Sequence, residues 1–282
     1  MRNHADFLFC GIELGERIER AEAEFIAAGS AAALERVGDD GGFVIGLAGG
    51  FACHTEAGSP LNKVAGLGFA GVPAAGELDE VERRCAAVGA PVQVELAHLG
   101  DPEVAETLTA RGYRLVGFEN VLGRSLGDAR AATVPPGIEV LRGDDTDFDR
   151  WADTVVGGFA VPDAQGVAPH EDFPRDVLER AVRDLAAAAG TRRYTALVDG
   201  EVAGGSSMRV TQGIAQLTGA ATLPAHRRRG VQSALLAARL AEAAAQGCDL
   251  AVVTTQPASK SQQNAQRQGF SLLYTRAILV KP

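Results

Sequence analysis

Long apolar runs, paired cysteines and a basic face are all missing from this sequence of 282 residues. No stretch approaches eighteen uninterrupted apolar residues, so the sequence predicts no membrane-spanning helix. The first twenty residues break their apolar stretch with Glu13 and Glu16 and lack the architecture of a signal peptide. We therefore expect a cytoplasmic protein that binds no membrane.

The four cysteines are far apart and show neither a CxxC pair nor the spacing of metal ligands. They are Cys10, Cys53, Cys85 and Cys248. We interpret them as buried free thiols in a reducing compartment, and we predict no metal site. His54 and His98 are isolated histidines, and we expect structural roles for both.

Charge is distributed unevenly along the chain, whose formal net charge is -9. Residues 1–130 hold 11 basic and 20 acidic side chains, whereas residues 131–282 hold 16 of each. Neither half is basic, which argues against a nucleic-acid-binding protein. The acidic residues of the first half either form an ordinary solvated surface or attract a cationic ligand such as an amine.

The segment Gly127–Gly137 has the small, polar and Pro-Gly character of a linker. It predicts two domains, residues 1–126 and residues 138–282, joined by residues 127–137. Both halves mix helical and strand patterns, which predicts the α+β class with mixed, mostly antiparallel sheets flanked by helices. The clearest strand signals are listed here: Phe43–Leu47, Lys63–Phe69, Val92–Leu96, a hairpin at Tyr194–Val198 and Val202–Val210 around Asp199-Gly200, and Ile214–Thr222.

The C-terminal ends of the two halves share a pattern of strand, polar loop, helix, Gly-aromatic pair and strand. Aligned at an offset of 157 residues, Gly112-Tyr113 falls on Gly269-Phe270 and Val121-Leu122 falls on Ile278-Leu279. Few residues are identical, so common elements could match by coincidence. We favour a duplicated fold.

The most informative stretch runs from Thr218 to Gly247: a strand, a basic turn containing glycine, and a long Ala/Leu-rich helix. Such a turn at a helix N-terminus binds anions, because the first backbone N–H groups have no partner in the helix and the helix dipole favours negative charge. Gly230 allows close approach, and Arg227, Arg228 and Arg229 add positive charge. Taken alone, three successive arginines are equally consistent with a solvated surface turn that binds no ligand.

The spacing Pro224-x-x-Arg227-x-x-Gly230-x-Gln232-Ser233 resembles the acetyl-CoA signature of the GCN5-related N-acetyltransferases (GNAT). The resemblance continues through the strand Leu250–Thr254, the helix with Asn264, and Gly269-Phe270, and covers most of residues 138–282. It implies that the C-terminal domain uses acetyl-CoA as a cosubstrate, bound where two strands splay apart. Together with the repeat, it implies two acetyltransferase-like domains. The residues that the resemblance assigns to acetyl-CoA are Ala220, Ala221, Thr222, Arg228, Arg229, Gly230, Val231, Gln232, Ser233 and Asn264.

Departures from the family pattern leave the catalytic residues unknown. Ala265 stands where many members have a tyrosine that protonates the leaving thiolate, and the motif's final Gly/Ala is Gln232. Gln216 and Thr218 stand near the position of a glutamate base. The alternative proton carriers are Tyr274, Tyr194, His170 and Glu171. We name no catalytic residue.

The N-terminal half is interpreted as a degenerate copy without a CoA motif, because Glu77, Asp79 and Glu80 take the place of the arginines and would repel a pyrophosphate. We expect it to wall the acceptor site, extend the sheet or form a dimer surface. The loop Gly157–Asp172 is either a lid over the acceptor or a plain connection.

The predicted function is transfer of an acetyl group from acetyl-CoA to an amine of a small molecule, by a bacterial enzyme for which a homodimer is one expected assembly. Two alternatives stay open. The protein could be a CoA-binding sensor or scaffold without turnover, or an acyltransferase that uses another acyl-CoA.

Overall fold

The computed structural model describes residues 8–38, 41–127, 134–161, 165–168 and 170–282. Part of the predicted linker (128–133) and part of the loop at 157–172 (162–164 and 169) lie outside the described residues. In the described part, eleven strands form a single sheet, in the order β1-β2-β3-β4-β11-β5-β10-β9-β8-β7-β6. Their bounds are β1 Phe43–Leu47, β2 Gly50–His54, β3 Lys63–Ala65, β4 Val92–Ala97, β5 Arg114–Ser125, β6 Ile138–Arg142, β7 Thr191–Val198, β8 Glu201–Thr211, β9 Ile214–Thr222, β10 Leu250–Thr255 and β11 Ser271–Lys281.

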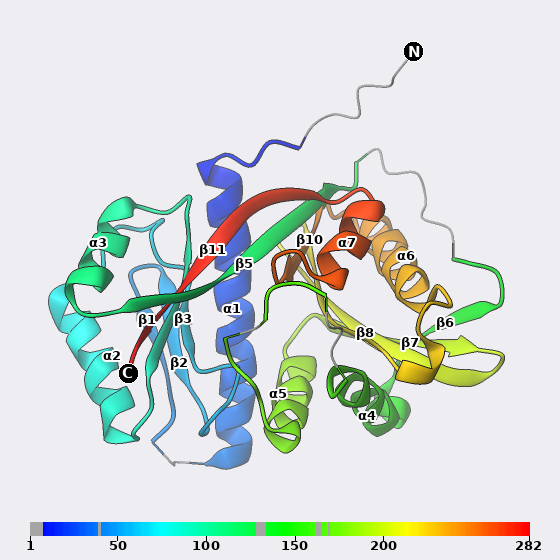
Figure 1. Ribbon diagram of the computed structural model, residues 1–282, viewed down its shortest axis with the longest axis horizontal. Helices are drawn as coiled ribbons and strands as arrows, with labels where there is room; N and C mark the ends of the chain where they lie inside the picture. The colour runs from blue at the N-terminus through cyan, green and yellow to red at the C-terminus, as the bar shows by residue number, and fades with distance from the viewer. Residues whose placement is uncertain (1–7, 39–40, 128–133, 162–164, 169) are drawn as a thin grey trace.

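Helices cover both faces of this sheet. The described helices are α1 Ile12–Val37, α2 Ala75–Ala87, α3 Pro102–Ala110, α4 Phe148–Phe159, α5 Arg175–Ala187, α6 Val231–Ala245 and α7 Lys260–Arg267. One face packs against α2 and α3 at one end and against α6 and α7 at the other, through two large apolar clusters. The opposite face carries α1, α4 and α5, and α1 runs across the middle of the molecule (Figure 1).

The two halves exchange their final strands. The C-terminal strand β11 lies between β4 and β5 of the N-terminal half, antiparallel to both. In return β5 pairs antiparallel with β10 of the C-terminal half. The long strands β5 and β11 therefore cross the centre of the molecule side by side (Figure 1), and the sheet continues without a break from one half to the other.

The repeat read from the sequence has a counterpart in these elements. At the offset of 157 residues, β4, α3 and β5 correspond to β10, α7 and β11, with bounds that agree to within two residues. Glu119 on β5 and Arg276 on β11 correspond at this offset and also face each other in the strand pairing. The two strands therefore pair antiparallel with matching positions of the repeat opposite each other.

The predicted fold class is confirmed: the protein is of the mixed α+β class with a mostly antiparallel sheet. Parallel pairing occurs between β3 and β4 and between β9 and β10. The predicted strand Lys63–Phe69 is shorter than expected, because β3 ends at Ala65 and Gly66 and Gly68 have φ angles of 84° and 95°. Among the described helices, none is long and apolar enough to cross a membrane.

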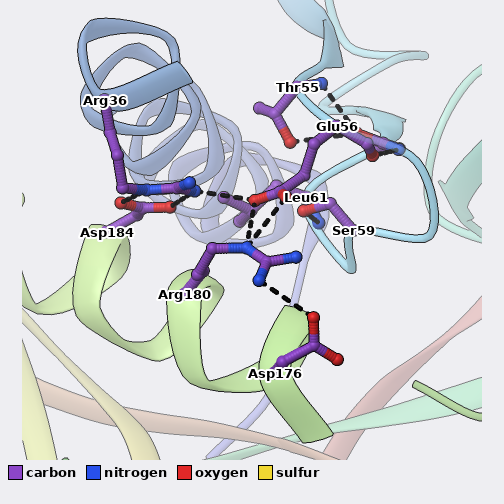
Figure 2. A network of polar contacts seen from close by, with 9 residues as sticks. Arg36, Thr55, Glu56, Ser59, Leu61, Asp176, Arg180 and Asp184 are labelled. Atoms are coloured by element: carbon purple, nitrogen blue, oxygen red, sulfur yellow. Dashed lines mark hydrogen bonds and ion pairs between the residues drawn. The ribbon is translucent and has the colours of Figure 1, made fainter. Parts of the chain in front are cut away.

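A polar network fastens α1 to α5 of the other half (Figure 2). Arg36 on α1 binds Asp184 on α5 at 2.6 Å and Glu56, in the loop after β2, at 2.7 Å. Arg180 on α5 binds the same Glu56 at 2.9 Å and Asp176 at 3.0 Å. Since Glu56 is shared by both arginines, the network fixes where α1 lies against the C-terminal half.

Candidate active site

The strands β9 and β10 begin as a parallel pair and then separate. Their pairing runs from Ile214 opposite Leu250 to Gln216 opposite Val252 and stops there, although β9 continues to Thr222 and β10 to Thr255. A wedge therefore opens between the strands, with its apex at Gln216. This is the splayed pair that the sequence resemblance implies.

A bulge in β9 bends it within the wedge. The register between β8 and β9 shifts between Gly205, opposite Ala221, and Ser207, opposite Thr218. Gly219 at the bulge has a φ of 55°, and an added Cβ would lie 2.9 Å from Ser207 Oγ. An extra residue on one strand locally disrupts the ladder and increases its bend, which turns β9 away from β10.

Buried Arg239 on α6 satisfies backbone carbonyls beside this bulge. Its guanidinium donates to the carbonyl oxygen of Ser207 at 3.0 Å and to that of Thr218 at 3.3 Å. Burial lowers the pKa of Arg239 to about 10. The residue thus ties α6 to the bend in β9 and forms part of the wall of the wedge.

The wedge holds a cavity of about 300 Å³ between α6 and α7 on one side and α1 and α4 on the other. Its lining residues are Glu22, Phe159, Gln216, Leu217, Thr218, Gly219, Ala220, Gln232, Leu236, Arg239, Val252, Val253, Thr254, Ser261, Asn264 and Ala265. Elements from both halves of the chain therefore enclose it. The mixture of an apolar lining with a few polar groups is typical of small-molecule sites.

The turn before α6 has the geometry expected of an anion site. Gly230 is the N-cap residue, with a φ of 89°, and no side chain caps the helix. The first N–H groups of α6 therefore point out of the helix end without an intrahelical partner. Arg228 also has a positive φ, 62°, which is unusual for a residue with a side chain.

The three arginines of this turn play different parts. Arg227 donates to the backbone carbonyl oxygens of Thr222 and Gly158, so it stabilises the loop. Arg229 pairs with Asp199 at 2.7 Å. Arg228 is exposed, and no hydrogen bond or ion pair is found for it among the residues that the structure describes. Arg228 is thus available to a ligand.

The residues assigned to acetyl-CoA from the sequence fall into two groups. Ala220, Gln232 and Asn264 line the cavity itself. The others lie where β9 finishes and α6 starts, outside the cavity lining: Ala221, Thr222, Arg228, Arg229, Gly230, Val231 and Ser233. The side chains of Ala221 and Val231 are buried in the core, so these two residues offer backbone groups only.

The proposed alternative proton carriers lie away from the lining of the cavity. The hydroxyl of Tyr274 donates to Glu19, and that of Tyr194 donates to Glu242 at 2.8 Å. Burial raises the pKa of both tyrosines. His170 Nε2 lies 2.9 Å from Gln93 Oε1, over β4.

Ala265 and Gln216, which stand where the family has a tyrosine and near where it has a glutamate, do line the cavity. Ala265 is buried on α7. The amide of Gln216 donates from Nε2 to Glu22 at 3.1 Å, and its Oε1 accepts from Arg209 at 3.0 Å. At these two positions the cavity is therefore lined by the amide of Gln216 and the methyl group of Ala265, neither of which is ionisable.

Glu22 is a cavity residue that the sequence interpretation missed. It lies on α1, 194 residues before its partner Gln216. Ile18, Phe25 and Ile26 have the spacing of one helix face, but nothing local in the sequence indicates that α1 crosses to the other half. The contact of Glu22 with Gln216 joins residues far apart in the sequence, so no local motif indicates it.

Buried charges surround Glu22 at the junction of the halves. Arg276, on β11, pairs with Glu19 at 2.8 Å and lies 3.8–4.0 Å from three more carboxylates, those of Glu22, Glu95 and Glu119. Burial, reinforced by the neighbouring Glu95 carboxylate, raises the pKa of Glu119 to about 7. Four carboxylates therefore share the neighbourhood of one buried guanidinium.

Comparison with known proteins supports the interpretation of the wedge. Residues 161–270 match the family model described as the acetyltransferase (GNAT) family. A GCN5-related N-acetyltransferase from Kribbella flavida is similar in structure, with a TM-score of 0.63 and 19% identity over 92% of this chain and 95% of that one. A tandem GNAT protein from the clavulanic acid biosynthesis pathway gives a TM-score of 0.60 and 12% identity over 96% of each chain.

A third similar structure is a GCN5-related N-acetyltransferase from Sphaerobacter thermophilus, with a TM-score of 0.53 and 16% identity over 72% of this chain and 66% of that one. Among curated proteins, none matches. Identities this low show the fold alone, while the family model identifies the segment that carries the wedge. Residues 161–270 therefore match the GNAT family model, within a chain that has the fold of GNAT proteins, a tandem member among them.

Proposed function

We propose that this protein transfers an acetyl group from acetyl-CoA to an amine of a small molecule. One observation carries the proposal: a cavity at the apex of a strand wedge opens beside a helix N-terminus that has no side-chain cap and an exposed arginine. A long ligand with an anionic end and a reactive apolar end fits that combination.

The pyrophosphate of CoA would lie at the start of α6. Backbone N–H groups of Val231, Gln232 and Ser233 would donate to it, Gly230 would allow close approach, and Arg228 would supply charge. Arg229 would contribute less, because Asp199 already neutralises it. The fit rests on donors that face outward and on the positive φ of Gly230.

The arm of CoA would extend from that turn toward the apex of the wedge. Ala220, Ala221 and Thr222 would offer backbone groups along β9, where β10 no longer pairs with them. Asn264 would reach the arm from α7. The cavity then encloses the thioester, which aligns it and limits its access to water.

In the reaction, the lone pair of the amine attacks the thioester carbonyl carbon and the C–S bond breaks. The nitrogen loses a proton and the CoA thiolate gains one, so that an amide and free CoA leave. Neither Tyr274 nor Tyr194 is assigned this proton transfer, because each is bonded inside the core.

Two alternatives follow from the same cavity. Ala265 and Gln216 lack the ionisable groups that many members use, which favours a CoA-binding sensor or scaffold without turnover. An acyltransferase with a longer acyl donor would use the same wedge. Both alternatives bind CoA at α6. The sensor would release no thiol from acetyl-CoA, and the other acyltransferase would release CoA from a different acyl donor.

The N-terminal half is part of the proposal as a copy that binds no CoA. Its own parallel pair, β3 and β4, is joined over two residue pairs, and the small cavity beside it measures about 10 Å³. Glu77 caps α2 there by accepting from the backbone N–H of Ala74 at 2.8 Å. A carboxylate thus occupies the helix start that an anionic ligand would need. A cytoplasmic location and a homodimer remain predictions.

Release of free thiol from acyl-CoA tests this function. Acetyl-CoA, propionyl-CoA and succinyl-CoA are each incubated with the protein and a panel of diamines, polyamines, aminoglycosides and amino acids. We expect amine-dependent thiol release that is fastest with acetyl-CoA. Faster thiol release with propionyl-CoA or succinyl-CoA would show that the acyl donor is one of these instead. If the protein binds acetyl-CoA but releases no thiol with any amine of the panel, the sensor is favoured.

A further inference from the structure

Helix α1 brings a carboxylate from the N-terminal half into the cavity of the C-terminal half. Glu22 lines the cavity together with Gln216, whose Nε2 donates to it at 3.1 Å. The position of α1 is fixed by its network with α5, which Figure 2 shows at the end of the helix. Glu22 is therefore held in the cavity wall by its hydrogen bond to Gln216 and by the position of α1.

The position of Glu22 corresponds to the apex of the wedge. Its partner Gln216 is the last residue of β9 that pairs with β10, whereas Thr222 ends β9 beside the α6 turn. Thr222 is six positions further along the strand than Gln216, about 20 Å at ~3.3 Å per residue. A ligand anchored by its pyrophosphate at the turn and extended along β9 thus places its far end near Glu22.

The Glu22 carboxylate is partly exposed and is not the closest ion-pair partner of Arg276. Arg276 has Glu19 as its nearest carboxylate, at 2.8 Å, while Glu22 is 3.8 Å away. The side chain of Glu22 is 21% exposed and that of Glu19 is 2% exposed. Glu22 thus keeps an accessible carboxylate in a half-buried setting, where a charged hydrogen bond is stronger than in water.

The surroundings of Glu22 carry a negative excess. Four carboxylates, those of Glu19, Glu22, Glu95 and Glu119, lie within 4.0 Å of Arg276. Lys63 supplies a second cation, in an ion pair with Glu95, and Arg209 has Glu24 at 3.9 Å. Arg276 and Lys63 thus stand against four carboxylates, so one more cation would reduce the repulsion among them.

We propose that Glu22 binds the acceptor beside the thioester through an ammonium group, so that the acceptor is a cationic amine. Before attack the reacting nitrogen loses one proton to water, and as the amide forms it gives a second proton to the CoA thiolate. The assignment rests on the proposed function, since it places the thioester at the apex of the wedge. It gives the N-terminal half a direct part in the choice of acceptor. A neutral nucleophile such as an alcohol would leave the partly desolvated Glu22 carboxylate with only the more distant Arg276, 3.8 Å away, as an ion-pair partner among the residues that the structure describes.

Two CoA thioethers test the proposal without knowledge of the acceptor. S-(2-aminoethyl)-CoA carries an ammonium group two carbons from sulfur, and S-propyl-CoA carries a methyl group in its place. Calorimetric titration gives the ratio of their dissociation constants. We expect the wild type to bind the ammonium analogue about tenfold more tightly, as a charge-assisted hydrogen bond supplies, and Glu22→Gln to abolish this preference.

The control is Glu35→Gln, which removes one carboxylate from the same helix at an exposed position, about 20 Å further along at ~1.5 Å per residue. It should keep the preference. If E22Q does not fold, Glu22→Asp, which retracts the charge by one methylene, should weaken the preference at unchanged affinity for S-propyl-CoA.

Three results would count against these ideas in different ways. Equal affinity of the wild type for both analogues, or a preference that survives in E22Q, would overturn the role of Glu22. Failure of the wild type to bind either analogue would instead overturn the proposed function, and the assignment of Glu22 with it.

Discussion

Burial governs how single residues behave at the junction between the two halves. Arg276 is 1% exposed and is held by Glu19 at 2.8 Å, with Glu119 at 3.9 Å on the neighbouring strand. Because water solvates these charges poorly, each one depends on its neighbours. Such residues should respond strongly to pH and to removal of a partner.

Glu119→Gln should change the pH dependence of stability. Burial raises the pKa of Glu119 from 4.5 to about 7. A carboxyl group whose pKa is raised in the folded state contributes stability that is present below about pH 4.5 and is lost as pH rises to 7. From pH 5 to pH 7 the wild type should lose up to about 1.4 kcal/mol per pH unit more than E119Q.

Urea unfolding at pH 5 and pH 8 measures this difference in the free energy of unfolding. Glu35→Gln, at an exposed site on α1, should follow the wild type at both values. If E119Q and the wild type show the same pH dependence, the Glu119 carboxyl group titrates normally and the negative excess at the junction is smaller than inferred.

Arg239→Leu should weaken both the fold and the wedge. The substitution leaves the carbonyl oxygens of Ser207 and Thr218 without their buried donor. An unsatisfied buried acceptor costs about 1–3 kcal/mol, so the free energy of unfolding should fall by about 2 kcal/mol. Urea unfolding with calorimetric titration of acetyl-CoA checks this, and unchanged stability with unchanged affinity would contradict the role given to Arg239.

At the scale of elements, the position of α1 depends on the network shown in Figure 2. Glu56 accepts from Arg36 and Arg180, which come from the two halves. Burial would raise the pKa of Glu56, but its bonds to the two arginines outweigh that effect and lower it. A lowered carboxyl pKa contributes stability at neutral pH that is lost as the solution becomes acidic.

Glu56→Gln should therefore destabilise the protein by about 1 kcal/mol at pH 7, as expected for a network of ion pairs with partly buried members. Asp176→Asn is the matched control in the same network, because Asp176 is 70% exposed and its pair with Arg180 joins residues of one helix. We expect it to cost less than about 0.5 kcal/mol. Thermal melting of both variants at pH 7 would contradict the account if Asp176→Asn were the more damaging one.

Some elements could be predicted because their signal is local. β1 and β9 have the bounds that alternation and turn residues indicate, and the hairpin of β7 and β8 follows from Asp199-Gly200, with φ angles of 54° and 83°. The strand β2 was missed, although it follows β1 through a similar two-residue turn with positive φ angles at Ala48 and Gly49. Alanine lacks the side-chain oxygen that makes asparagine and aspartate signals of this turn.

The site divides in the same way. The turn before α6 is contiguous in sequence, so its glycine and arginines could be recognised together. The arrangement of Glu22, Gln216 and Arg276 depends on strand exchange and on the path of α1, and residues this far apart leave no motif.

At the scale of the whole molecule, the strand exchange makes each half depend on the other. β4 and β5 both pair with β11, which comes from the end of the chain. Residues 1–126 alone would lack the strand between them. The predicted domain boundary at residues 127–137 is therefore a boundary in sequence across which the sheet continues.

The full chain should unfold in one cooperative transition, because the central strands β5 and β11 belong to both halves. Calorimetry should show a single peak whose calorimetric and van't Hoff enthalpies agree. We expect a fragment of residues 1–126 to remain unfolded by circular dichroism. Two separate peaks, or a folded fragment, would show that the exchange does not couple the halves.

Calorimetric titration of acetyl-CoA tests the central claim, that the wedge and the α6 turn bind CoA, most directly. The wild type is compared with Arg228→Glu/Gly230→Asp, which places two carboxylates at the turn, and with Arg83→Glu, an exposed site on α2. We predict binding to the wild type and to R83E, and a loss of at least about a hundredfold in the double variant. Absence of binding to the wild type, or equal affinity in the double variant, would contradict the claim.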